Sequence, residues 1–281
     1  MSRIPSDVAA AVLVADVGNS RIKLGVVADQ GDGVRVLPTI HRRQDLFSRG
    51  FRQENLRAWL AAAAPGPALM LVASVHDAAA ARLEASLAEL SATQHRPLRQ
   101  RRVMHGDMGI AVRVDEPHRV GIDRLAAAAA AGIIKPQGRP AIIVDCGTAA
   151  TVDIVAADGG FLGGAILPGP ALMTKALAEG TSRLPEVAAL ERGEVPAFPG
   201  RSTQQAIAAG IGWGMRGAIA RLVAEARRFL GPEADPEVLL TGGWRAAVRE
   251  AVPDAREMPD LVLAGIALAA RPKTRTACET G

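Results

Sequence analysis

The sequence predicts an α/β protein built from two related domains, each carrying a phosphate-binding hairpin. The first observation is a polar turn, Asp16-Val-Gly-Asn-Ser-Arg-Ile-Lys23, between the apolar segments Ala10–Ala15 and Leu24–Val27. Two apolar runs joined through a glycine-asparagine turn are typical of a β-hairpin. The second observation is a copy of this pattern at Ala141–Val155, roughly 130 residues later. That spacing is too long for a solenoid repeat and suits a duplicated domain.

Both turns contain residue types that bind phosphate. In each, an apolar strand is followed by an aspartate, one further residue, a glycine and a small polar pair, so that Asp16 corresponds to Asp145 and Gly18 to Gly147. Backbone N–H groups of such a turn can hold a phosphate, and a lysine adds a point charge. Lys23 is conspicuous because the chain has only four lysines and uses arginine elsewhere. For either turn alone, an ordinary surface hairpin is the alternative.

Length and composition limit the class of protein. The 281 residues are enough for two domains with separate cores. We predict domain limits of 1–118 and 119–281, with the C-terminal helix as a candidate to pack back on the first domain. Hydrophobic and charged contents of 49% and 22% are typical of globular proteins.

Charge and cysteine usage narrow the partners and the compartment. The net charge of +4 is modest and tyrosine is absent, so a nucleic-acid surface is not indicated. The mild positive excess suits a cleft for anionic substrates. No apolar stretch is long enough to span a membrane. Cys146 and Cys278 show neither metal-ligand spacing nor a disulfide framework, which favours a reducing compartment and a cytoplasmic location.

Hydrophobic spacing predicts the remaining elements. In the first domain we expect strands over Val34–Ile40 and Ala68–Val75, and helices over Asp45–Ala64 and Ala78–Leu90. In the second domain the expected elements are a strand over Phe161–Leu167, helices over Ala171–Ala178, about Gln204 to Leu230 and Leu261–Ala270, and a strand at Val238–Gly243 that ends in a glycine turn.

A third polar motif, Gly121-Ile-Asp-Arg124, precedes an alanine-rich helix over Leu125–Ile134. Asp123 falls at the helix start, where a carboxylate is favoured by capping and by the helix dipole. Alternatively, Asp123 is a general base and Arg124 a clamp for an anionic substrate. The motif alone leaves both open.

Taken together and in chain order, these motifs resemble those of the type III pantothenate kinases. The resemblance extends from about Val12 to Ala270. The residues that carry it are Asp16–Lys23, Gly121–Arg124, Asp145–Thr151 with Asp153, Gly163–Gly169, Thr181–Pro185, Thr203 with Ala206–Gly210, and Thr241–Gly243.

The resemblance implies the fold of acetate and sugar kinases, Hsp70 and actin, in which two ribonuclease-H-like α/β domains surround a nucleotide cleft. It also implies ATP-dependent phosphorylation of pantothenate to 4′-phosphopantothenate, the first step of coenzyme A biosynthesis. The implied enzyme is a cytoplasmic homodimer that uses magnesium and a monovalent cation, potassium or ammonium, and contacts neither nucleic acid nor membrane.

The resemblance further implies a role for each motif residue. Asp16 orients magnesium through the ATP, and Asp145 is similar to the family's ligand for the monovalent cation. Asp123 is the catalytic base, and Arg124 pairs with the pantothenate carboxylate. The implied phosphate-binding residues are Asp16, Gly18, Asn19, Ser20, Lys23 and Thr148, and the implied substrate-binding residues are Gly121, Ile122, Asp123, Arg124 and Thr181.

One position departs from the family pattern. The family commonly has a substrate-contacting tyrosine seven residues before the glycine of the Gly-x-Asp-Arg motif, where this chain has Val114. Two alternatives stay open. One is a non-catalytic regulatory factor of the same fold, against which the intact set of charged motif residues argues. The other, which the departure at Val114 keeps open, is a superfamily kinase that acts on another small hydroxyl acceptor.

Overall fold

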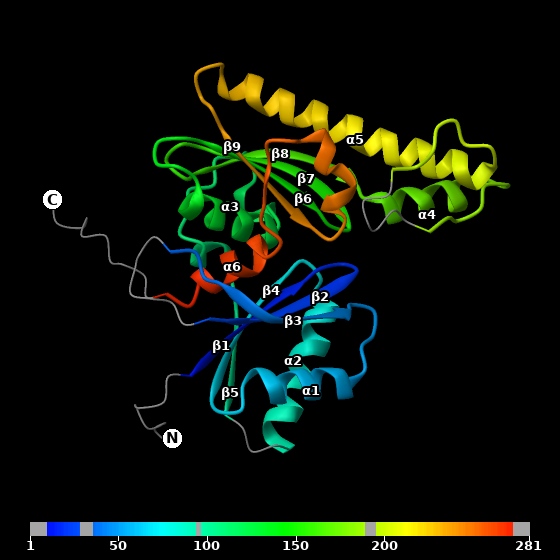
Figure 1. The fold of residues 1–281 in the computed structure, drawn as a ribbon. Helices are drawn as coiled ribbons and strands as arrows, with labels where there is room; N and C mark the ends of the chain where they lie inside the picture. Colours follow the sequence, from blue (N-terminus) through cyan, green and yellow to red (C-terminus); the bar gives the residue numbers. More distant parts are fainter. Residues whose placement is uncertain (1–9, 29–35, 94–96, 189–194, 272–281) are drawn as a thin grey trace. The chain divides into compact units, whose positions relative to one another are not determined.

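The chain folds into two compact units, which the computed structural model describes over residues 10–28, 36–93, 97–188 and 195–271 (Figure 1). The first unit contains the described residues of Met1–Ile110, His118–Ala130 and Val262–Gly281, and the second those of Ala111–Pro117 and Ala131–Leu261. The domain limits of 1–118 and 119–281 stay a prediction. No helix in the described parts of the chain combines the length and apolar character needed to cross a bilayer.

A mixed five-stranded sheet forms the centre of the first unit, in the order β3-β2-β1-β4-β5. β1 pairs antiparallel with β2 and parallel with β4, β2 pairs antiparallel with β3, and β4 pairs parallel with β5. The elements are β1 (Ala11–Val17), β2 (Arg21–Val27), β3 (Ile40–Phe47), α1 (Gln53–Ala63), β4 (Ala68–Ser74), α2 (Asp77–Thr93), β5 (Leu98–Arg102) and the short helix η1 (His105–Asp107).

Helices α1 and α2 cover one face of this sheet (Figure 1). Alternate residues of β1, including Leu13, Ala15 and Val17, form a buried core with apolar residues of these helices, such as Leu60 and Leu83. Because strand side chains alternate between faces, Asp16 points to the opposite face.

The second unit repeats the same plan with the strand order β10-β9-β6-β7-β8. Its core contains apolar residues of β6, β7 and β9 together with one face of the 28-residue helix α5. The elements are β6 (Ala141–Cys146), β7 (Ala149–Val155), β8 (Phe161–Pro168), α4 (Pro170–Gly180), α5 (Thr203–Leu230), β9 (Glu237–Gly242), η3 (Arg245–Ala251) and β10 (Arg256–Glu257). Residues of η2 (Pro117–Arg119), α3 (Ile122–Ile134) and α6 (Leu261–Leu268) belong to both units.

The two sheets confirm the predicted duplication. In each, the first strand of the hairpin is central, the next two strands of the chain extend one side of the sheet as an antiparallel meander, and two parallel strands complete the other side. Two copies of this mixed sheet, each with a polar turn after its central strand, define the duplicated ribonuclease-H-like fold of the actin-like ATPases.

Two expectations for the first unit are wrong. The strand expected over Val34–Ile40 begins at Ile40, with 34 and 35 outside the described residues. The helix expected from Asp45 begins only at Gln53, because residues 45–47 complete β3 against β2. Leu46 and Phe47 fit a helical spacing, but only Leu46 is buried, as the alternation of a strand requires.

Helices α3 and α6 meet within the first unit at a close backbone contact. A Cβ atom at Gly265 of α6 would overlap the carbonyl group of Ala126 in α3. The glycine therefore permits a helix approach that any side chain would prevent.

Candidate active site

Asp16 and Lys23 face each other across the first hairpin. They are directly paired residues of β1 and β2, and Lys23 is in turn paired with Asp45 of β3. The Lys23 Nζ atom lies 3.5 Å from Asp16 Oδ2, and the side chains are 26% and 10% exposed. Cross-strand pairing therefore places one ammonium group between two carboxylates on the same face of the sheet.

The Asp16 carboxylate is desolvated and close to the Gly121–Arg124 motif. Burial raises the pKa of Asp16 above its ordinary value; the Lys23 ammonium lowers it, and the charges of Asp123 and Asp45 raise it further. The third motif lies beside the first turn within the first unit: a Cβ at Gly121 would be 3.5 Å from Val75 Cγ1, and the Val75 N–H donates to the Val17 carbonyl. A carboxylate whose pKa is raised by burial, close to a second carboxylate, is a marker of functional sites.

Asp16 is expected to lower stability at neutral pH. A carboxyl whose folded pKa is raised binds its proton more readily in the folded state, so stability falls as pH rises through that window. We expect Asp16→Asn to melt above the wild type at pH 7, with the difference shrinking as the pH is lowered toward the folded pKa of Asp16. Thermal melts of both proteins between pH 7 and pH 4 measure this. A variant that melts lower at pH 7 would show that the ion pair with Lys23 outweighs the cost of burial.

The first residues of α3 carry the third motif. Asp123 Oδ1 accepts a hydrogen bond of 2.8 Å from the backbone N–H of Arg124. A Cβ atom at Gly121 would overlap this same carboxylate oxygen, so the glycine is needed for the observed carboxylate position. Ile122 is buried. The His105 Nε2 atom lies 2.6 Å from the carbonyl oxygen of Val120, which fixes the residue that precedes the motif.

The carbonyl groups of the first turn are held from outside the hairpin. Ser48, fully buried between β3 and α1, donates from its hydroxyl to the Gly18 carbonyl at 2.7 Å. The backbone N–H of Ser48 donates to the Ser20 carbonyl at 3.0 Å. In the described parts of the chain, no group accepts a hydrogen bond from the N–H of Asn19, so this amide is available for a ligand.

The second turn follows β6 and is one residue shorter. Asp145 is paired with Thr151 of β7 and Thr241 of β9. The Trp244 indole N–H donates to the Gly147 carbonyl at 2.6 Å, and the backbone N–H of Gly169 donates to the Thr148 carbonyl at 3.1 Å. The second turn is therefore also held through its carbonyl groups.

Cys146 lies between Asp145 and Gly147 and is fully buried. Burial raises the pKa of its thiol far above the ordinary value. Because the thiolate is the reactive form, Cys146 is a packing residue, as expected from the sequence.

Two further candidate positions lie elsewhere in the second unit. Thr181 follows α4, where its hydroxyl donates to the Leu177 carbonyl at 2.8 Å and accepts from the Leu184 N–H at 3.3 Å. Val114 lies beside β8, where its Cγ1 atom is 3.4 Å from the position that a Cβ of Gly163 would take.

The segment that contains Val114 is fastened to the second sheet. Val112 forms a parallel bridge with Phe161, and the Arg113 guanidinium pairs with the carboxylate of Asp158. Val114 therefore packs directly against Gly163 of β8, where the close contact favours a small side chain.

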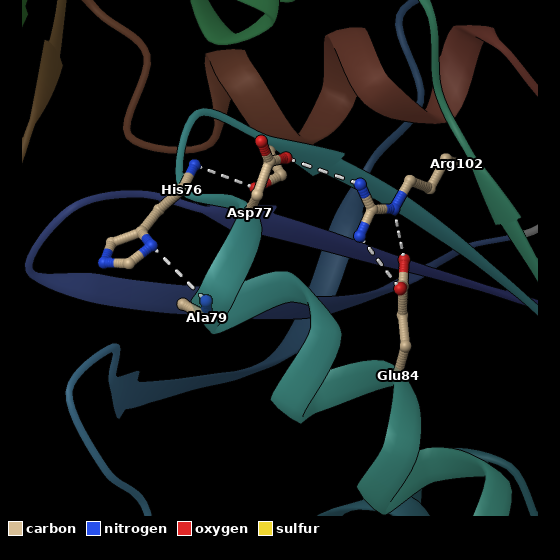
Figure 2. A network of polar contacts seen from close by, with 6 residues as sticks. His76, Asp77, Ala79, Glu84 and Arg102 are labelled. Carbon is tan, nitrogen blue, oxygen red and sulfur yellow. Dashed lines mark hydrogen bonds and ion pairs between the residues drawn. The ribbon is translucent and has the colours of Figure 1, made fainter.

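The end of β4 lies next to the first turn, because the Val75 N–H donates to the Val17 carbonyl at 3.1 Å. Figure 2 shows the polar contacts that fix this end. His76 Nδ1 accepts from the Ala79 N–H at 3.3 Å at the start of α2. Arg102 of β5 contacts both Glu84 and Asp77. His76 thus has a structural role at the sheet edge where the functional turn lies.

The described side chains fit a metal carried by a nucleotide better than a metal cage. They include no group of three or more His, Cys, Asp or Glu placed to hold an ion. Mg²⁺ is usually bound by one or two carboxylates together with substrate phosphates and water. Asp16 offers one such carboxylate, and Asp145 another oxygen donor at the equivalent strand end.

The sequence did not reveal Ser48, Trp244 or His105. Ser48 is 30 residues from Gly18, and Trp244 is 97 residues from Gly147. Their roles depend on long-range contacts with backbone carbonyls, which carry no residue pattern of their own. Ser48 was moreover expected inside a helix.

A family model described as type III pantothenate kinase matches residues 12–225. A type III pantothenate kinase of Alkalilimnicola ehrlichii is 37% identical over 265 residues, which cover 92% of this chain and 97% of its own. The corresponding protein of Halorhodospira halophila is 34% identical over 257 residues, covering 90% and 95%. That of Rhodopirellula baltica is 42% identical over 170 residues, 59% of each chain.

A crystal structure from Campylobacter jejuni, described as a Baf family transcriptional activator, superposes with a TM-score of 0.51 at 18% identity, covering 92% of this chain and 96% of its own. At this identity the likeness shows the fold alone. The two mixed sheets with their polar turns define an actin-like fold of two ribonuclease-H-like domains. The chain belongs to the type III pantothenate kinase family.

Proposed function

We propose that the protein transfers the γ-phosphoryl group of ATP to the primary hydroxyl of pantothenate, giving 4′-phosphopantothenate and ADP. Family membership supports this function. The single structural observation that carries it is that the Asp16–Lys23 pair and the Gly121–Arg124 motif lie side by side in the first unit, both next to the end of β4. Phosphoryl transfer needs positioning and charge neutralisation more than covalent chemistry. The Lys23 ammonium group can neutralise phosphate charge, and the carboxylates of Asp16 and Asp123 can position the metal and the acceptor hydroxyl.

Each polar turn binds phosphate through residues of its own unit. In the first turn, the N–H groups of Gly18, Asn19 and Ser20 act together with Lys23, and Asp16 orients the magnesium that ATP carries. In the second turn, Thr148 is the phosphate-binding residue. Magnesium oriented by Asp16 neutralises charge on the phosphates. The buried position of Asp16 supports this role, because a desolvated carboxylate interacts more strongly with a cation than an exposed one.

Pantothenate is held by the third motif. Arg124 pairs with its carboxylate, and Gly121, Ile122 and Thr181 are the other substrate-binding residues of the proposal. Asp123 accepts the proton of the primary hydroxyl as its oxygen bonds to the γ-phosphorus and the bond to ADP breaks. The overlap that a Cβ at Gly121 would make with Asp123 Oδ1 supports a carboxylate held in one position.

Asp145 is the proposed ligand for a monovalent cation, potassium or ammonium, near the phosphates. Its position near the C-terminal end of the central strand of the second sheet, equivalent to that of Asp16 in the first, supports this assignment. We also infer that the enzyme works in the cytoplasm, where the free thiol of Cys146 remains reduced.

We infer that the enzyme is a homodimer formed through the second unit. An open apolar groove of about 410 Å³ lies between α4 and α5, lined by residues such as Met173, Leu177 and Ile207. Leu172 and Trp213 of the same helices are 41% and 47% exposed. Exposed apolar patches of this kind mark interaction sites.

We expect Leu172→Asp and Trp213→Asp each to convert the dimer to a monomer, because a charge at an apolar interface is costly to desolvate. Sedimentation velocity over a range of concentrations measures this. The control is Phe47→Asp, since Phe47 is an exposed residue of the first unit. A wild type that is monomeric at all concentrations would remove the proposal.

The choice of acceptor tests the substrate assignment against the alternative of another small hydroxyl compound. We expect ADP release with pantothenate and little release with glucose, glycerol or pantothenol, which retains the hydroxyl but lacks the carboxylate. Equal turnover of pantothenol would remove the pairing with Arg124. Turnover of a sugar without turnover of pantothenate would favour the other kinase class.

A further inference from the structure

The two phosphate turns share a structural feature beyond their sequence pattern. In each, the carbonyl group of the turn glycine accepts a hydrogen bond from a side chain outside the hairpin. Ser48 Oγ lies 2.7 Å from the Gly18 oxygen, and Trp244 Nε1 lies 2.6 Å from the Gly147 oxygen. Both donors are buried, with 0% and 8% of their surface exposed.

Holding a carbonyl also orients an amide. A trans peptide group is planar, and its C=O and N–H point in opposite directions. The bond from Ser48 to Gly18 therefore turns the N–H of Asn19 away from Ser48. The bond from Trp244 to Gly147 does the same for the N–H of Thr148. In the described parts of the chain, neither of these two N–H groups donates to a protein acceptor.

The first donor is itself held in place. The Arg82 guanidinium of α2 donates to the Ser48 carbonyl. One residue earlier, the Phe47 ring lies under the guanidinium of Arg21, with the Arg21 Cζ atom 5.0 Å from the ring centroid. Arg21 directly follows the turn and Phe47 directly precedes Ser48. The Arg21–Phe47 contact therefore links the turn to the segment that carries Ser48, and Arg82 holds Ser48 itself.

The second donor is fixed by the backbone around it. The backbone N–H of Trp244 donates to the Cys146 carbonyl at 3.4 Å. Gly242 has φ of +93°, and a Cβ there would overlap the backbone of Cys146. The glycine thus lets the chain before Trp244 lie against the strand that leads into the second turn.

We propose that Ser48 and Trp244 are positioning residues that orient the Asn19 and Thr148 amides toward the phosphates of the nucleotide. This proposal rests on the proposed nucleotide-binding function of the two turns. Neither side chain touches the phosphates in this account. Each acts by holding a carbonyl, so that an amide donor is oriented before the ligand arrives.

The test measures the part of nucleotide affinity that depends on phosphate. Dissociation constants for ADP and for adenosine are determined by calorimetry for the wild type, Ser48→Ala and Trp244→Phe. Loss of one hydrogen bond of ordinary strength corresponds to about a fivefold change. We expect ADP to bind about fivefold more weakly to each variant and adenosine to bind unchanged. A merely structural loosening would weaken both ligands by similar factors.

Trp59→Phe is a matched control for Trp244→Phe. Trp59 Nε1 also donates to a backbone carbonyl, that of Arg42, at 2.6 Å, and its side chain is 7% exposed. We expect this variant to lose stability comparably and to keep the ADP-to-adenosine ratio of the wild type. Ser48→Thr retains the hydroxyl and is expected to restore ADP binding relative to Ser48→Ala. If Ser48→Ala does not fold, the pair of tryptophan variants decides the question.

The outcomes separate this inference from the proposed function. Unchanged ADP affinity in both variants of an enzyme that phosphorylates pantothenate would overturn the inference alone. If the variants bind ADP more weakly and adenosine as before, but the wild type does not phosphorylate pantothenate, the inference is supported and the assignment of pantothenate as the acceptor is wrong. A wild type that binds ADP no better than adenosine would overturn both.

Discussion

Asp123→Asn is expected to lower kcat for pantothenate phosphorylation by about 10²–10⁴. Asparagine is nearly the same size, and its amide oxygen can still accept the 2.8 Å hydrogen bond from the Arg124 N–H. The start of α3 should therefore be preserved. What is lost is the ability to take the proton from the attacking hydroxyl. Steady-state kinetics with ATP and pantothenate varied separately measures the effect, and KM for ATP should change little.

Asp77→Asn is a suitable control for this substitution. Asp77 also begins a helix of the first unit, but its charge partner is the partly exposed Arg102 at 3.5 Å. We expect near wild-type kinetics from this variant, because such surface pairs contribute little. If Asp123→Asn retained the wild-type kcat, the assignment of Asp123 as general base would be wrong.

Gly265→Ala is expected to destabilise the protein by about 1–3 kcal/mol. The added methyl group would overlap the carbonyl of Ala126, and relief requires α3 and α6 to move apart. Intrinsic helix propensity acts in the opposite direction, since alanine is favoured over glycine by up to about 1 kcal/mol. Denaturant unfolding should therefore show a net loss, and the melting temperature should fall by several degrees.

Gly132→Ala provides the matched comparison in α3. A Cβ at Gly132 would lie 3.9 Å from the Cα of Gly159, an ordinary contact. We expect this variant to be as stable as the wild type or slightly more stable. Equal stability of both alanine variants would contradict the close contact of α3 with α6.

The paired hairpins were predictable from the sequence because two local signals coincided in each. A run of apolar residues on both sides of a polar glycine turn specifies strand, turn and strand without any distant contact. The duplication followed from the match of Asp16 to Asp145, and the equal strand orders of the two sheets confirm it. The roles of the individual site residues remain predictions drawn from the family resemblance.

The connection between β3 and α1 could not be predicted in the same way. Leu46 and Phe47 fit helical spacing with the apolar residues of α1, so periodicity alone extended the helix backward over Ser48. Pairing of β3 with β2 overrides that local preference. The error hid the residue whose hydroxyl holds the Gly18 carbonyl. Trp244 was hidden for a similar reason, because its indole N–H meets a carbonyl 97 residues away in the chain.

The charged residues of the first unit argue against the regulatory alternative. The Campylobacter jejuni structure described as a transcriptional activator shares this fold at 18% identity, which decides nothing about catalysis. The Asp16–Lys23 pair and the carboxylate at Asp123 are the features that a non-catalytic relative would not need. A fold held by two apolar cores does not require a buried charged residue at the end of its central strand.

The most direct test of the central claim is the formation of 4′-phosphopantothenate by the wild type from ATP and pantothenate with magnesium present. Product is measured by mass spectrometry, with potassium added in one series and replaced by sodium in the other. The account predicts product in both, more of it with potassium, and loss of the potassium effect in Asp145→Asn. ATP binding without any phosphopantothenate would contradict the claim that this chain is a pantothenate kinase.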